Sequence, residues 1–146
     1  MDKRKTIFIV DDNQIFIKSL CSLIAENSLH KIVGIADNAE KAMELIIQSQ
    51  PDLIIIEISI PIMGGISMIY KLQSVKKKPK IILVSFHNSE EYIKMANSVK
   101  ADAFIWKGDI SEKLIPSINN LFTKEFRPIA RKRIKEKLNF LKNNHI

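Results

Sequence analysis

The fold is decided by a short apolar run that ends in an acid, Leu53-Ile54-Ile55-Ile56-Glu57. The run does not alternate with polar residues, which is the pattern of a parallel strand covered on both faces. Similar short apolar runs lie at residues 7–10, 31–35, 81–84 and 103–106. The sequence therefore predicts five short strands.

Longer amphipathic stretches separate these runs and are predicted to form helices. They cover residues 14–26, 38–49, 66–74, 89–99 and 111–122. Asn38 and Ser111 are the expected N-caps of two of them. Strands that alternate with helices predict an α/β fold, with a doubly wound parallel sheet, right-handed crossovers and helices on both faces. In such folds, functional residues gather at the carboxyl ends of the strands.

Composition indicates a soluble protein of one compact domain. The chain has 146 residues, 46% of them hydrophobic and 27% charged, which are ordinary values for a globular protein. Cys21 is the sole cysteine, so an intrachain disulfide is excluded and a reducing compartment is favoured. No apolar run approaches the roughly 20 residues that span a bilayer, and the charged N-terminus does not resemble a signal peptide. We expect a cytoplasmic location.

Charge is distributed unevenly along the chain. Residues 1–123 carry 15 Lys/Arg and 14 Asp/Glu, whereas residues 124–146 carry 8 Lys/Arg and 2 Asp/Glu. We therefore expect a nearly neutral domain, 1–123, followed by a basic amphipathic helical tail, 124–146. This tail could pack on its own domain or on a second copy, or bind nucleic acid, an anionic surface or an acidic partner. The sequence shows no helix-turn-helix after it, so sequence-specific DNA binding has little support.

Polar residues close four of the five predicted strands. They are Asp11 and Asp12, Glu57, Ser85 and Lys107. Carboxylates gathered at one edge repel one another unless something compensates, and Mg²⁺ with oxygen ligands would do so. A lysine and a hydroxyl can contact an anionic group. The edge is therefore predicted to hold a metal ion and a small anion.

These residues, in this order and on these strands, resemble the receiver domain of two-component response regulators. The resemblance covers residues 5–122 and includes the segment 51–65, which is similar to the stretch around the phospho-accepting aspartate. Pro61, Met63 and Gly65 follow position 57 at the family's spacing. The resemblance implies a flavodoxin-like sheet with strand order 2-1-3-4-5.

The resemblance also implies a magnesium site. Asp12 would ligate Mg²⁺ directly and Asp11 mainly through water. Position 57 and the backbone carbonyl of Ser59 would complete the protein ligands.

The family's switch residues have counterparts here as well. By the resemblance, Ser85 and Lys107 would contact phosphoryl oxygens, and the aromatic residue Phe104 would follow Ser85 inward on activation. The surface formed by residues 89–99, 103–106 and 111–122 would then change its partner preference, because the domain shifts between two existing states.

A signalling role follows from the resemblance, and an enzymatic one does not. The implied upstream partner is a histidine kinase or a phosphotransfer protein. The implied output is a protein contact on the surface just described, with a homodimer as a further possibility. A phosphatase with an aspartyl nucleophile is disfavoured, because position 57 is not Asp and the sequence shows no cap domain.

Position 57 departs from the family, because Glu57 stands where the phospho-acceptor is Asp. Glu adds one methylene, while catalytic geometry tolerates errors of about 0.5 Å. We therefore expect no efficient phosphoryl transfer, and we expect the carboxylate to reach toward Ser85 and Lys107 and imitate part of the phosphoryl charge. Three explanations stay open: an engineered change that imitates activation, a natural receiver that has left phosphorylation behind, and one that still accepts phosphate poorly or elsewhere.

Simpler interpretations remain beside this one. Asp11 and Asp12 could merely cap a helix, and Glu57 could pair with Lys107 without any signalling role. Trp106 alternates with Lys107, so it should point away from the pocket, into the core or toward a partner. The whole chain could also be a phosphate-independent adaptor whose basic tail binds an acidic partner or nucleic acid.

Overall fold

The computed structural model describes residues 4–60, 64–87 and 89–123. The predicted basic tail lies outside the described residues, as do Pro61 and Met63. The chain divides into two compact units, residues 1–115 and 116–146. The first unit contains the whole sheet.

The sheet has five parallel strands in the order β2-β1-β3-β4-β5, which confirms the predicted fold. The strands are β1 (Thr6–Val10), β2 (Lys31–Ala36), β3 (Leu53–Glu57), β4 (Lys80–Ser85) and β5 (Ala103–Trp106). In the register, Val10 pairs with Ile56, Glu57 with Val84, and Ser85 with Trp106. The polar residues that close these strands are therefore brought to one edge.

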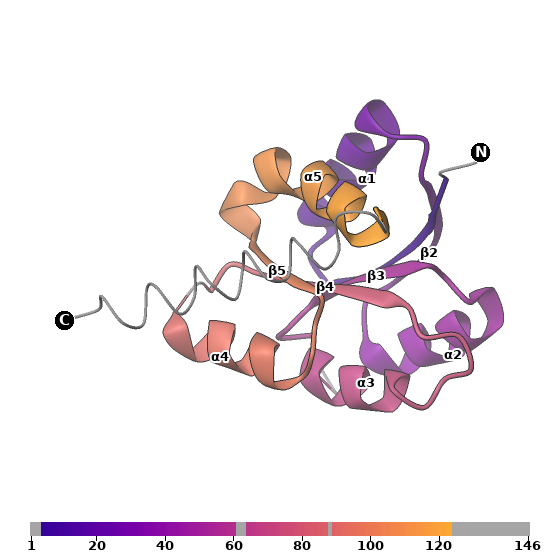
Figure 1. Ribbon diagram of the computed structural model, residues 1–146, viewed down its shortest axis with the longest axis vertical. Helices are drawn as coiled ribbons and strands as arrows, with labels where there is room; N and C mark the ends of the chain where they lie inside the picture. The colour runs from indigo at the N-terminus through magenta and orange to yellow at the C-terminus, as the bar shows by residue number, and fades with distance from the viewer. Residues whose placement is uncertain (1–3, 61–63, 88, 124–146) are drawn as a thin grey trace. The chain divides into compact units, whose positions relative to one another are not determined.

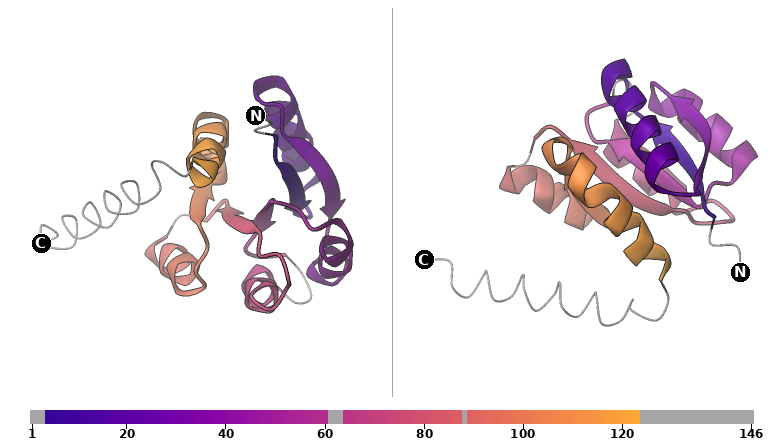
Figure 2. Two further views of the ribbon diagram at one scale, coloured as in Figure 1. Left: turned by 45° about the vertical axis from the view of Figure 1, so that its right-hand side comes forward. Right: turned by 90° about the horizontal axis from the view of Figure 1, so that it is seen from above.

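The helices agree with the predicted ranges to within a few residues. They are α1 (Gln14–Asn27), α2 (Ala39–Ser49), α3 (Gly65–Leu72), α4 (Glu90–Ser98) and α5 (Ile110–Phe122). Figures 1 and 2 show α1 on one face of the sheet and α2, α3 and α4 on the opposite face. Helix α5 begins in the first unit and continues into the second.

One of the two expected N-caps is confirmed and the other is wrong. The Asn38 side chain accepts the backbone N–H of Lys41 at 2.9 Å and caps α2. Ser111 caps nothing, because α5 begins one residue before it. A 3-10 turn, η1 (Lys107–Asp109), runs directly into α5, so a separate N-cap is not needed there.

The central strand β3 is buried along its whole length, which explains its unbroken apolar pattern. Ile54 and Ile56 join a core cluster with α2 and α3 residues such as Ala42 and Met68. Ile55 is also fully buried and alternates with them, so its side chain lies on the opposite face. Glu57 is the polar end of this otherwise apolar strand.

Gly65 lets α3 begin close to the end of β3. A Cβ atom at this position would lie 2.7 Å from the backbone oxygen of Glu57 and 3.1 Å from the Cα of Ile58. The Gly65 N–H donates to the Ile58 carbonyl at 3.1 Å. Because the close neighbours are backbone atoms, they cannot move aside as a side chain would.

Replacing Gly65 by Ala should therefore destabilise the protein by about 2 kcal/mol, since overpacking against fixed atoms forces the backbone apart. Urea denaturation followed by circular dichroism measures the change. Ser67→Ala is a matched control, because Ser67 is exposed on the same helix and should shift the free energy of unfolding by less than about 0.5 kcal/mol. Equal stabilities for both variants would contradict the close approach.

Candidate functional site

The Lys107 ammonium lies between two carboxylates at the carboxyl edge of the sheet. Its Nζ is 2.8 Å from Asp11 Oδ2 and 3.0 Å from Glu57 Oε1. The side chains of Lys107, Asp11 and Glu57 are 1%, 1% and 8% exposed. The ends of β1, β3 and β5 thus supply a buried group of two acids and one lysine, which we call the acid–lysine cluster.

Burial makes each member of the cluster depend on the others. Removing a charge from water costs several kcal/mol, and only close opposite charges and hydrogen bonds offset it. Asp11 Oδ2 accepts no hydrogen bond among the described residues. The 2.8 Å contact with Lys107 is an ion pair without hydrogen-bond direction. Lys107 is therefore the counter-charge of an otherwise unsatisfied buried oxygen.

The turn after β1 points the two neighbouring acids in different directions. Asp11 Oδ1 accepts the N–H of Asn13 at 2.9 Å, and the Asn13 side chain accepts the N–H of Phe16 at 3.0 Å. Asp11 is consequently buried, whereas Asp12 is exposed. The N-cap of α1 is Asn13, so the interpretation of the acid pair as the helix cap is wrong.

Glu57 is held at both carboxylate oxygens. Oε1 contacts Lys107 as described, and Oε2 accepts a long hydrogen bond, 3.4 Å, from the N–H of Ser59. Ser59 itself is exposed. The loop after β3 thus contributes a backbone donor to the cluster.

Ser85 and Phe104 are engaged elsewhere. Ser85 is fully buried, and its Oγ accepts the N–H of His87 at 3.0 Å. Within the part of the chain that the structure describes, no hydrogen bond joins Ser85 to Glu57 or Lys107. Phe104 is half-buried and packs against the core cluster that includes α2 and α3 residues.

Two phenylalanine rings surround the Lys107 ammonium on its remaining sides. Nζ lies 4.2 Å from the ring centroid of Phe16 and 5.0 Å from that of Phe86. The rings meet edge to face, with centroids 6.4 Å apart and planes at 66°. An ammonium over aromatic faces gains cation–π attraction, which grows when water is excluded. Neither phenylalanine was predicted from the sequence, although Phe86 directly follows Ser85.

Trp106 points outward, as the alternation along β5 predicts, and is 37% exposed. Its Nε1 donates to the Phe86 carbonyl at 2.8 Å. The hydrogen bond ties the end of β5 to the loop after β4. It therefore fixes the backbone that carries one of the two rings over Lys107.

The carboxylates are not arranged as a ready metal site. Among the residues described, no group of three or more acidic, histidine or cysteine side chains is placed to hold a metal ion. Asp12 faces solvent, and the Lys107 ammonium stands between Asp11 and Glu57. In this arrangement the lysine supplies the positive charge that a cation would otherwise supply.

Comparison with known protein families places this geometry in context. The family model for the response regulator receiver domain matches residues 7–119. The chain belongs to this family. Receiver domains are signalling modules of two-component response regulators.

The similar curated proteins are longer regulators. The nitrate/nitrite response regulator protein NarL of Escherichia coli is 29% identical over 114 residues, which are 78% of this chain and 53% of that protein. The transcriptional regulatory protein DegU of Brevibacillus brevis is 25% identical over 112 residues, covering 77% and 48%. The chain spans about half the length of these relatives.

Solved structures support the fold. The signal receiver domain of NarL from Mycobacterium tuberculosis has a TM-score of 0.77 at 20% identity, covering 84% of this chain and 99% of that one. The response regulator domain of CheB from Thermotoga maritima has a TM-score of 0.74 at 22% identity, covering 82% and 97%. No helix in the described part of the receiver is long and apolar enough to cross a membrane.

Lys107→Met should destabilise the receiver by about 3 kcal/mol, because it leaves two buried carboxylates without their counter-charge. Adding Glu57→Gln to this variant should restore part of the loss, since one of the repelling charges is gone. Urea denaturation at neutral pH of the two single variants and the double variant measures the coupling, which should exceed about 1 kcal/mol. Simple additivity would mean that the cluster is not a unit.

Proposed function

We propose that this receiver serves two-component signal transduction with a pocket whose charge balance is set by Glu57 rather than by a phosphoryl group. The observation that carries the proposal is the 3.0 Å contact between Glu57 Oε1 and Lys107 Nζ in a buried cluster. By the family resemblance, Lys107 is the residue that would contact the oxygens of a phosphoryl group. Here that lysine already has an anionic partner.

Glu57 occupies the position that the family resemblance gives to the phospho-accepting aspartate. It ends the central strand β3 and pairs in register with Val84, one residue before the end of β4. The extra methylene of Glu relative to Asp extends the carboxylate toward the lysine. A side chain of this length can place an oxygen where a phosphoryl oxygen would otherwise sit.

Two features oppose phosphoryl transfer to Glu57. In-line attack needs reacting atoms placed within about 0.5 Å of the productive geometry, and a longer acid displaces the attacking oxygen. The Glu57 side chain is also 8% exposed, and the rings of Phe16 and Phe86 lie against its lysine partner. A phosphodonor would have to reach a carboxylate that is already paired with Lys107.

Magnesium binding is expected to be weaker than in a receiver with Asp at this position. Asp11 Oδ2 is a buried carboxylate oxygen without a hydrogen bond, and Asp12 and the Ser59 carbonyl are the further oxygen donors that the resemblance implies for a hard cation. Bound Mg²⁺ would neutralise the acids and orient a phosphoryl oxygen. Glu57 is paired with Lys107, so its carboxylate is less available as a ligand of the metal ion.

The signalling partners follow from the family. A histidine kinase or phosphotransfer protein is the expected upstream partner. Output would pass through the surface that includes α4 and β5, where Ile93, Met95 and Trp106 are partly exposed, with a second copy or a downstream protein as its partner.

Incubation with acetyl phosphate and Mg²⁺, followed by intact mass measurement, tests the proposal. The unaltered protein should gain no stable phosphoryl group. Glu57→Asp shortens the acid, releases part of the hold on Lys107 and should gain one phosphoryl group under the same conditions. Glu57→Gln is the matched control, since an amide cannot accept phosphate as a carboxylate does.

The result that overturns the proposal is a single added phosphoryl group on Glu57 of the unaltered chain. If no variant is phosphorylated, the circular dichroism spectrum of Glu57→Asp must first show a native fold. A folded Glu57→Asp protein that stays unmodified would show that the pocket has lost more than its acceptor.

A second function, a phosphate-independent adaptor that binds anionic partners, is favoured by the charge of residues 124–146. These 23 residues carry 8 Lys/Arg and 2 Asp/Glu. Under this proposal, replacing Arg131, Lys132, Arg133 and Lys135 by Gln should weaken binding to random-sequence duplex DNA and flatten its salt dependence. Fluorescence anisotropy at several salt concentrations measures both.

The control removes equal charge from the domain by replacing the exposed residues Lys18, Lys41, Lys71 and Lys94 by Gln. Glu57→Ala should leave DNA binding unchanged. If the tail and domain variants lose equal DNA affinity, the binding depends only on net charge, and the adaptor function is contradicted.

A further inference from the structure

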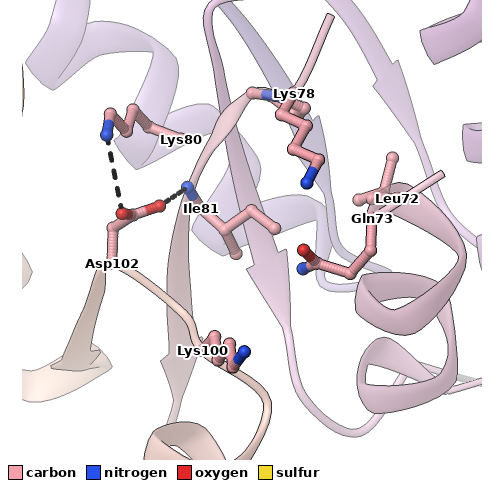
Figure 3. A pocket seen from close by; sticks show the side chains of 8 residues that line it. Leu72, Gln73, Lys78, Lys80, Ile81, Lys100 and Asp102 are labelled. Atoms are coloured by element: carbon pink, nitrogen blue, oxygen red, sulfur yellow. Dashed lines mark hydrogen bonds and ion pairs between the residues drawn. The ribbon is translucent and has the colours of Figure 1, made fainter. Parts of the chain in front are cut away.

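The opposite edge of the sheet holds a cationic hollow. It has a volume of about 190 Å³ and lies at the start of β4, between the C-terminal ends of α3 and α4 (Figure 3). Buried Leu72, Pro79 and Ile81 form its apolar floor. Polar side chains line the rest of the hollow: Gln73, Lys78, Lys80, Lys100 and Asp102.

The lysines of this hollow are not neutralised by its one acid. Asp102 accepts the N–H of Ile81 at 2.8 Å, and its other oxygen lies 3.8 Å from Lys80 Nζ. No carboxylate among the described residues forms an ion pair with Lys78 or Lys100. The neighbouring Lys77, by contrast, pairs with Asp52 at 2.9 Å. The hollow therefore has a net charge of +2 from its lining side chains.

Figure 3 shows how the head groups lie. The Lys78 ammonium and the Gln73 amide turn toward the same space in front of Ile81, whereas Lys80 turns toward Asp102. An ammonium supplies up to three donors and an amide supplies both donors and an acceptor. The arrangement offers cationic and neutral donors to one small group of acceptor oxygens.

Lys100 is placed in the hollow by a backbone conformation that disfavours it. Its φ is +59°, in the left-handed region, directly after the cap of α4 at Val99. This position after a helix usually holds Gly or Asn, because a Cβ is strained there. The Lys100 charge favours the nearby helix C-terminus, and the side chain lines the hollow.

We propose that this hollow binds a small dianion that carries a phosphate group. A volume of about 190 Å³ holds roughly six water molecules, enough for a phosphate group and part of its hydration shell. The +2 charge matches a dianion. The site is formed by the amino end of β4, while the acid–lysine cluster lies beyond its carboxyl end, so the inference does not depend on the proposed function of Glu57.

Titration of ¹⁵N-labelled full-length protein with inorganic phosphate, at ionic strength held constant with chloride, tests the proposal. Saturable shifts are expected at the amides of Gln73, Ile81 and Lys100. A Kd of about 1 mM is expected for a few charge-assisted contacts at an open site. Glycerol 3-phosphate, as a second probe, shows whether a phosphate monoester binds there as well as free phosphate does.

The variants separate binding from stability. Lys100→Gly relieves the backbone strain and should keep the melting temperature at or above that of the unaltered protein, yet weaken phosphate binding about tenfold. Lys78→Gln should weaken binding by a similar factor, and Lys100→Arg should retain it. Lys18→Gln, which removes the same charge from the exposed face of α1, should leave it unchanged.

Three results would overturn the proposal. One is the absence of saturable shifts at these amides. Another is a Lys100→Gly protein that binds phosphate as tightly as the unaltered chain. The third is a set of shifts confined to residues around Ser85 and Lys107, which would place the anion at the other edge of the sheet.

Discussion

The arrangement of the functional edge depends on one buried lysine that balances two acids from different strands. Asp11, Glu57 and Lys107 end or follow β1, β3 and β5, so their contact spans the end of β4, which lies between β3 and β5. Buried charges are tolerated only when they are paired. The turn that directs Asp11 inward and the rings that pack on Lys107 both serve this pairing. If Lys107 moves away, each buried acid needs another positive charge or a hydrogen-bond donor to remain stable.

The fold could be predicted because local pattern and topology agree. Five apolar runs, four of them closed by polar residues and all separated by amphipathic stretches, admit few arrangements other than a doubly wound parallel sheet. The position of the cluster follows from the same logic, since the carboxyl ends of parallel strands meet at one edge. The prediction of Ser111 as an N-cap was wrong, because a hydroxyl before a helical stretch does not reveal that a 3-10 turn already leads into the helix.

Other parts of the site could not be predicted from sequence. Asp11 and Asp12 are chemically identical, and only the turn built by Asn13 makes one buried and the other exposed. Phe16 and Phe86 lie 70 positions apart and carry no motif, so their approach to Lys107 requires the packed structure. Ser85 ends β4 at this edge, but its hydrogen bond to His87 depends on the geometry of the following loop.

The length of the acid at position 57 decides between two uses of the same pocket. Under the proposed function, a shorter acid would leave room in front of the lysine for a phosphoryl group, which would change the charge of the site. In the structure, Glu57 contacts the lysine at 3.0 Å with a single negative charge, a smaller charge than a phosphoryl group would bring. The lysine is satisfied but Ser85 is not recruited, since its hydroxyl stays with the backbone of its own loop. Under the proposed function, a glutamate in this pocket would reproduce the lysine contact of an activated receiver and leave the serine hydroxyl contact unmade.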